Sequence, residues 1–200
     1  MISTELPQKE CTPQWSANLI LIDADYLDSV AFDLIVNFER MIGRRIPQAD
    51  LCHWLNCIAL DGGLRQGKND IQVVFLHGKE KKQLLHFIPS NFETDLNGKA
   101  FTDAIGEFTL QSFPVEKVIS TADFFIQSLE AAIESQDVKN IMVIADMDTY
   151  GERVKSTAVK AENKEVMLFS MQPLSGRGFL QEILGYSLMS ALGIRSEELR

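Results

Sequence analysis

The feature that most constrains the fold is an apolar run that stops abruptly at two aspartates, and the chain contains it twice. LILIDAD covers residues 19–25 and IMVIADMD covers residues 141–148. An apolar run without alternating polar residues is typical of a strand buried on both faces. Both runs therefore predict strands of a mostly parallel sheet. The carboxylates at their ends are Asp23, Asp25, Asp146 and Asp148.

Strand patterns and helix patterns alternate along the rest of the chain, which predicts an α/β fold with three layers, α/β/α, around a mostly parallel central sheet. We predict strands at 18–22, 71–77, 84–89, 107–113, 141–145 and 165–170. We predict helices from the first acidic cluster to Gly43, from Pro47 to Gly62, and at about 120–135, 151–162 and 178–192. Residues 1–17 are predicted to form a polar N-terminal arm, and residues 18–200 a single domain.

Composition and charge exclude some classes of function. Of the 200 residues, 46% are hydrophobic, and no apolar run reaches the roughly 18 to 20 residues of a membrane helix. The N-terminus has no secretory pattern, so we expect a cytoplasmic protein without membrane contact. The net charge of −9 disfavours a broad nucleic-acid surface but leaves room for local phosphate contacts. The basic bunches are Arg44 with Arg45, Arg65 with Lys68, and Lys79 with Lys81 and Lys82.

The paired aspartates predict a shared acidic site. In an extended segment residues i and i+2 point the same way, so each pair can present two carboxylates together. Two such charges about 4 Å apart repel by about 4 kcal/mol at an effective dielectric near 20. A raised pKa or a bound Mg²⁺ or Mn²⁺ would relieve that repulsion. The simpler interpretation is that Asp25, Asp28 or Asp148 caps the helix that begins nearby.

Asp123 is a further candidate, in the segment EKVISTADFF. Ser120 or Thr121 is a suitable N-cap, which places Asp123 in the first turn of the following helix. By itself this position indicates only compensation of the helix dipole.

Together these segments resemble the PIN-like nucleases, and within them the NYN group. The resemblance covers roughly residues 18–170 and depends on LIDADYL, on EKVISTAD and on IMVIADMDTYGERV. It implies RNA phosphodiester hydrolysis with Mg²⁺ or Mn²⁺. Tyr26, Ala145 and Thr149 replace residues that the family usually has, which implies weakened activity. The carboxylates implied to be catalytic are Asp23, Asp123, Asp146 and Asp148, with Asp25 as an added metal ligand.

Three other interpretations stay open. LIDADYLDS also resembles the opening of the haloacid-dehalogenase-like phosphatases, in which Asp23 would be the nucleophile. ADMDTYGERV resembles the Asp-x-Asp of Toprim domains, although no strand-end glutamate precedes it. A non-catalytic PIN-like module would use the last helix and the PLSGRGF loop for binding or for a homodimer contact. In that loop, Gly176 and Gly178 around Arg177 suit either an anion or a turn.

Overall fold

The fold is built on a seven-stranded sheet. The structure, a computed structural model, describes residues 14–199. The strands are ordered β5-β6-β3-β1-β7-β8-β9, and all but β5 run parallel. They are β1 (Asn18–Asp23), β3 (Asn69–Gly78), β5 (Lys99–Thr102), β6 (Gly106–Val115), β7 (Asn140–Ile144), β8 (Glu165–Ser170) and β9 (Leu180–Ile183).

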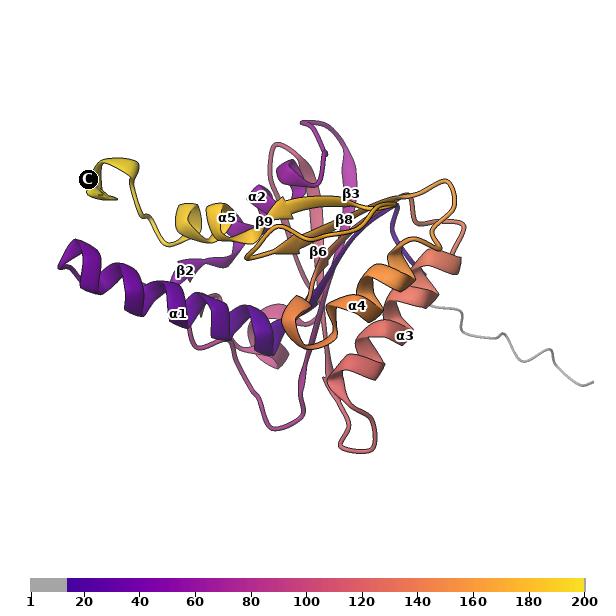
Figure 1. The fold of residues 1–200 in the computed structure, drawn as a ribbon, viewed down its shortest axis with the longest axis horizontal. Coiled ribbons are helices and arrows are strands. Elements are labelled where there is room, and N and C mark those ends of the chain that lie inside the picture. Colours follow the sequence, from indigo (N-terminus) through magenta and orange to yellow (C-terminus); the bar gives the residue numbers. More distant parts are fainter. Residues whose placement is uncertain (1–13, 200) are drawn as a thin grey trace, which may run out of the picture.

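Helices cover both faces of the sheet, which confirms the three-layer α/β/α fold. Leu19 and Leu21 of β1 pack with α3 and α4, whereas Ile20 and Ile22 pack with α1, α2 and α5. Figure 1 shows these two groups of helices on opposite sides of the sheet. Side chains alternate between the two faces of a strand, and helices cover both faces here. All four of these β1 side chains are therefore fully buried. The helices are α1 (Ala24–Ile42), α2 (Leu51–Asp61), α3 (Thr121–Glu134), α4 (Met147–Ala158) and α5 (Leu184–Ala191).

The first helix ends where the sequence predicts. Gly43 caps α1 with a φ of 76°, a left-handed conformation that glycine adopts without steric cost, and its N–H donates to Glu39. The second helix begins at Leu51 rather than at Pro47, because the side chain of Asp50 caps it through the N–H of His53. The start predicted at Pro47 is therefore wrong.

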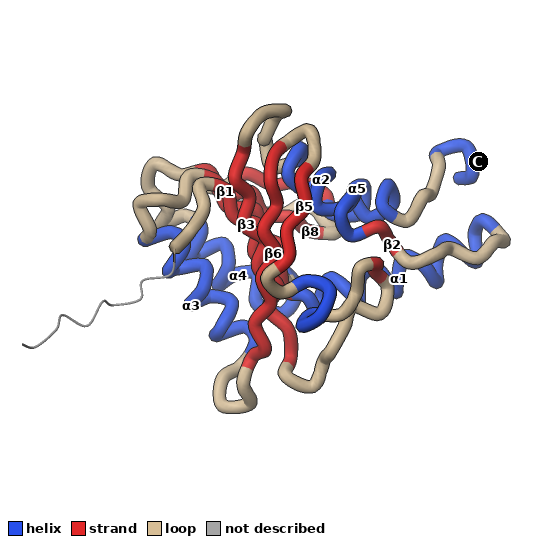
Figure 2. The backbone as a smooth tube through the Cα atoms, turned by 180° about the vertical axis from the view of Figure 1, so that it is seen from behind, coloured by secondary structure: helices blue, strands red, loops and turns tan. Residues whose placement is uncertain are grey.

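The C-terminal segment also differs from its prediction. The helix expected at about 178–192 is divided, because Leu180–Ile183 forms β9 beside β8, and α5 begins only at Leu184. The polar segment 90–104 contains β5, which Figure 2 shows beside β6, and one turn of π-helix, η1 (Phe92–Leu96). The strand expected at 84–89 is reduced to β4 (Phe87–Ile88), paired with β2 (Ala49–Asp50).

The N-terminal arm and the absence of a membrane helix are also predicted from the sequence. Most of the polar arm, residues 1–13, lies outside the described residues. Among residues 14–199, no helix is both long enough and apolar enough to cross a membrane.

Candidate functional site

The acidic strand ends lie at the point where the order of the parallel strands reverses. The chain passes from β1 to β3 and β6 on one side, and then returns to β7 and β8 on the other side of β1. In open parallel sheets such a reversal leaves a ligand crevice beyond the carboxyl ends of the strands. Asp23 is the last residue of β1, and Asp146 is the second residue after β7, so both belong to this edge.

Asp23 is a buried carboxylate with both oxygens occupied. Its side chain accepts hydrogen bonds from the N–H of Tyr26, at 3.1 Å, and from the hydroxyl of Tyr150, at 2.6 Å. The residue is only 4% exposed. Burial raises the pKa of Asp23 against the opposing effect of the two hydrogen bonds, and the nearby charges of Asp25 and Asp146 raise it further.

Asp146 is an N-cap. Its carboxylate accepts from the N–H of Thr149 at 3.0 Å and from the hydroxyl of the same residue at 2.7 Å. Tyr150, which follows, leaves the helical conformation with φ −134° and ψ 22°. This interruption occurs in the residue whose hydroxyl reaches Asp23, so one turn of α4 contacts both strand ends.

The extended geometry predicted for the carboxylates two residues apart is wrong. Helix α1 starts at Ala24 and helix α4 at Met147, so Asp25 and Asp148 lie in first helical turns rather than in extended chain. The two aspartates of each pair are therefore not on one side of an extended strand, although Asp146 and Asp148 both line one cleft beside α1. The caps are Asp23 and Asp146, the first aspartate of each pair, so the prediction that Asp25, Asp28 or Asp148 caps a helix is wrong.

Asp25 and Asp123 each have a partner of their own. The carboxylate of Asp25 accepts from the N–H of Gly78, at 2.9 Å. Asp123 contacts the hydroxyl of Ser120 at 2.7 Å and the guanidinium of Arg153 at 2.8 Å. The hydrogen bond from Ser120 has the largest effect on the pKa of Asp123, followed by that from Arg153, and both lower it. Ser120 is the N-cap of α3, as the sequence predicts.

A cleft of about 430 Å³ opens beside the strand ends, between α1 and the start of α4. Asp146 and Asp148 line it, together with Asp33. Burial and the charges of Asp146 and Asp148 raise the pKa of Tyr26 to about 12, so its hydroxyl stays protonated at neutral pH. The lining residues that sequence reasoning missed recur every three or four positions along one face of α1: Tyr26, Ser29, Asp33 and Asn37.

The cleft suits a hydrated divalent cation better than a cation enclosed by protein ligands. Within residues 14–199, no group of three or more His, Cys, Asp or Glu side chains is arranged to hold a metal. Mg²⁺, however, commonly keeps several waters and takes only one or two carboxylates plus substrate phosphates. Asp146 and Asp148 provide such a pair of carboxylates on the wall of one cleft.

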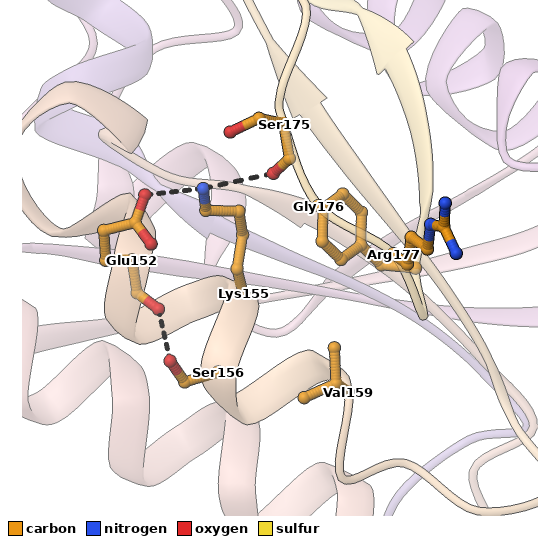
Figure 3. A pocket seen from close by; sticks show the side chains of 8 residues that line it. Glu152, Lys155, Ser156, Val159, Ser175, Gly176 and Arg177 are labelled. Atoms are coloured by element: carbon orange, nitrogen blue, oxygen red, sulfur yellow. Dashed lines mark hydrogen bonds and ion pairs between the residues drawn. The ribbon is translucent and has the colours of Figure 1, made fainter.

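The glycine loop before β9 forms a separate pocket of about 310 Å³ against α4 (Figure 3). Lys155 lies 2.5 Å from the carboxylate of Glu152 and 3.2 Å from the carbonyl of Ser175. Its charge is thus neutralised locally, and Arg177 points away from this pair in Figure 3. Gly176 and Gly178 both have positive φ, a conformation that glycine adopts without steric cost. The turn therefore explains the two glycines better than an anion site does.

The fold and this edge define an α/β protein with a carboxylate-lined crevice at the carboxyl ends of its central strands. The chain belongs to a family of unknown function, DUF6621, whose model matches residues 12–199. Searches of curated proteins and of solved structures gave no match. The resemblance to PIN-like nucleases stays a prediction.

The hydrogen bond from Tyr150 to Asp23 gives a testable stability effect. Tyr150→Phe removes a donor from a buried charged acceptor, which we expect to lower the free energy of unfolding at pH 7 by about 1.5–3 kcal/mol. Because the pKa of Asp23 is higher in the folded protein than in the unfolded chain, its protonation stabilises the fold. This stabilisation is fully present below pH 3.8, the ordinary pKa of aspartate, and is lost as the pH rises through the pKa of Asp23 in the folded protein. Removing the Tyr150 hydroxyl raises the pKa of Asp23 in the folded protein further. The loss of unfolding free energy caused by Tyr150→Phe should therefore be smaller at pH 4 than at pH 7.

Urea unfolding at pH 4 and pH 7 measures this difference. Tyr186→Phe is the matched control, because Tyr186 is 71% exposed and should tolerate the change at both pH values. A cost for Tyr150→Phe that is the same at both pH values would show that the buried carboxylate is not its origin.

Proposed function

We propose that this protein is a divalent-cation-dependent hydrolase of RNA phosphodiester bonds. One observation carries the proposal: Asp23 and Asp146 lie at the ends of the neighbouring strands β1 and β7, at the strand-order reversal, and Asp146 lines an acidic cleft there. Ligands of open parallel sheets bind at such reversals, and buried carboxylates with raised pKa values gather at functional sites.

The carboxylates have different proposed roles. Asp146 and Asp148 would hold Mg²⁺ or Mn²⁺, which supplies a water of lowered pKa and neutralises charge on the phosphate oxygens. Asp23 is a positioning residue, because its hydrogen bond from Tyr150 fixes the start of α4 relative to β1. The protonated hydroxyl of Tyr26 can donate a hydrogen bond to a phosphate oxygen in the cleft. Asp25 and Asp123 are left with their structural partners.

Incubation of the purified chain with single-stranded RNA tests the proposal. We expect cleavage with Mn²⁺ or Mg²⁺, and none when EDTA removes the cation. Cleavage that persists in EDTA would exclude the metal-dependent mechanism, and absence of cleavage with either metal would exclude the activity.

The phosphatase alternative finds little support in the geometry. A nucleophilic Asp23 needs a free oxygen facing substrate, but both of its oxygens accept hydrogen bonds and the residue is 4% exposed. Lys117, the lysine expected to steady the phosphate, is paired with Glu80 at 2.8 Å.

A non-catalytic binding module is the second candidate, and one observation favours it. Asp23, Asp25, Asp123 and Asp146 all accept hydrogen bonds within the protein, so the fold tolerates these charges without a cation. This candidate predicts RNA or protein binding without cleavage, and the same folding stability with and without Mn²⁺.

A further inference from the structure

A second pocket of about 430 Å³ lies beyond the carboxyl ends of β3 and β6 and is lined by three lysines. Lys79, Lys81 and Lys82 belong to the segment that leaves β3 after Gly78. Glu93 is the one carboxylate among the lining residues. A local excess of positive charge in a chain of net charge −9 needs a physical reason.

The lysine segment is held in place by backbone hydrogen bonds at both ends. The N–H of Lys81 donates to the carbonyl of Gly78 at 2.9 Å, and the carbonyl of Lys82 accepts from Phe92 at 3.0 Å. The ring of Phe92 in turn stacks on His77, with centroids 3.9 Å apart and planes within 4°. Two stacked rings thus line the pocket together with a hydrogen-bonded lysine segment.

The polar groups of the pocket are mainly donors. Lys79 pairs with Glu116 at 2.7 Å, but among the described residues Lys81 and Lys82 form no ion pair. Asn97 accepts from the N–H of Ser112 through its side-chain oxygen, which leaves its amide NH₂ group for a ligand.

Asn91 is arranged in the same way. Its side-chain oxygen accepts from the N–H groups of Glu93 and Thr94, and its NH₂ group remains as a donor. His77 adds no charge at neutral pH, because burial lowers its pKa. Ammonium and amide donors without a matching set of acceptors suit an anion.

This basic pocket adjoins the acidic edge of the sheet. The N–H of Gly78 donates to Asp25, in the first turn of α1, and Lys79 is the next residue along the chain. A strand of RNA that places one phosphodiester in the acidic cleft would thus have cationic groups available for a second phosphate on the neighbouring strands. The opposite charges divide the edge into a reaction side and a backbone-binding side.

We propose that the pocket formed by Lys79, Lys81 and Lys82 binds a backbone phosphate of single-stranded RNA, next to the bond whose cleavage is proposed above. The inference extends the proposed function by assigning where the polymer is held. It requires binding, and not cleavage, to depend on the two unpaired lysines.

Binding of a short fluorescein-labelled single-stranded RNA in EDTA tests this directly, because no metal-dependent cleavage occurs. The double variant Lys81→Glu/Lys82→Glu should bind at least about tenfold more weakly at low salt, because two ammonium groups that attract the phosphate are replaced by two carboxylates that repel it. The slope of log affinity against log salt should fall by about 0.7, since each neutralised phosphate of a single strand contributes about that much. Both lysines are exposed, and thermal unfolding verifies that the variant folds.

The matched control is Lys68→Glu/Lys139→Glu, which changes the net charge equally. Both lysines are exposed and directly precede β3 and β7, so they lie at the opposite edge of the sheet. Equal weakening by the two double variants, or no RNA binding by wild type, would overturn the pocket. Selective weakening by the pocket variant supports it even if RNA is never cleaved, in which case only the proposed hydrolysis fails. Cleavage with an unchanged KM in the pocket variant would reject the pocket and keep the hydrolase.

Discussion

The Asp146→Asn variant is expected to cleave RNA at least about a hundredfold more slowly than wild type. Asparagine removes one of the two charges proposed to hold the cation, and metal sites are sensitive to the loss of a carboxylate ligand. The helix should survive, because asparagine caps helices about as well as aspartate and can still accept from Thr149. Initial rates with saturating Mn²⁺, at equal protein concentration, measure the effect.

Asp137→Asn is the control for that variant. Asp137 is exposed and precedes β7, at the edge of the sheet opposite the cleft, so it loses the same charge without touching the site. We expect its cleavage rate to equal that of wild type. Equal rates for all three proteins would remove Asp146 from the mechanism.

Trp54→Ala is expected to destabilise the fold by about 3–5 kcal/mol, the largest stability effect that we predict. Trp54 is fully buried in α2, its ring lies 5.9 Å from that of Phe87, and its indole N–H donates to Ser187 at 3.2 Å. One side chain thus connects α2 with β4 and α5. Urea unfolding with linear extrapolation measures the loss.

Tyr186→Ala tests whether the loss comes from burial rather than from truncating an aromatic residue. Tyr186 lies next to Ser187 on α5 and is 71% exposed, so its replacement should change stability by no more than about 0.5 kcal/mol. Similar losses in the two variants would contradict the packing described for α2 and α5.

The central strands could be predicted from the sequence because they are buried on both faces. The apolar runs of β1 and β7 are unbroken, and β8 begins and ends at the predicted residues. The last helix could not be predicted correctly: Leu180, Ile183 and Leu184 recur at helical spacing, but the hydrogen bonds that Leu180–Ile183 can make with β8 depend on tertiary structure. Periodicity alone does not separate the two outcomes.

The candidate site was predictable in position but not in detail. Strand ends mark the edge where ligands bind, and this placed Asp23 and Asp146 together. Asp23 and Tyr150 are 127 residues apart in the sequence, so no local sequence pattern could predict their hydrogen bond. The ion pair between Asp123 and Arg153 joins two helices in the same way. Local sequence also did not show that helices start at once after the capping aspartates.

Calorimetric titration of Mn²⁺ into wild type and into Asp146→Asn tests the central claim most directly. The claim is that Asp146 and Asp148, at the reversal between β1 and β7, bind a divalent cation for hydrolysis. We predict saturable binding of Mn²⁺ to wild type and at least about a tenfold weaker interaction with the variant. Identical titrations of the two proteins, whether both bind or neither does, would contradict the account.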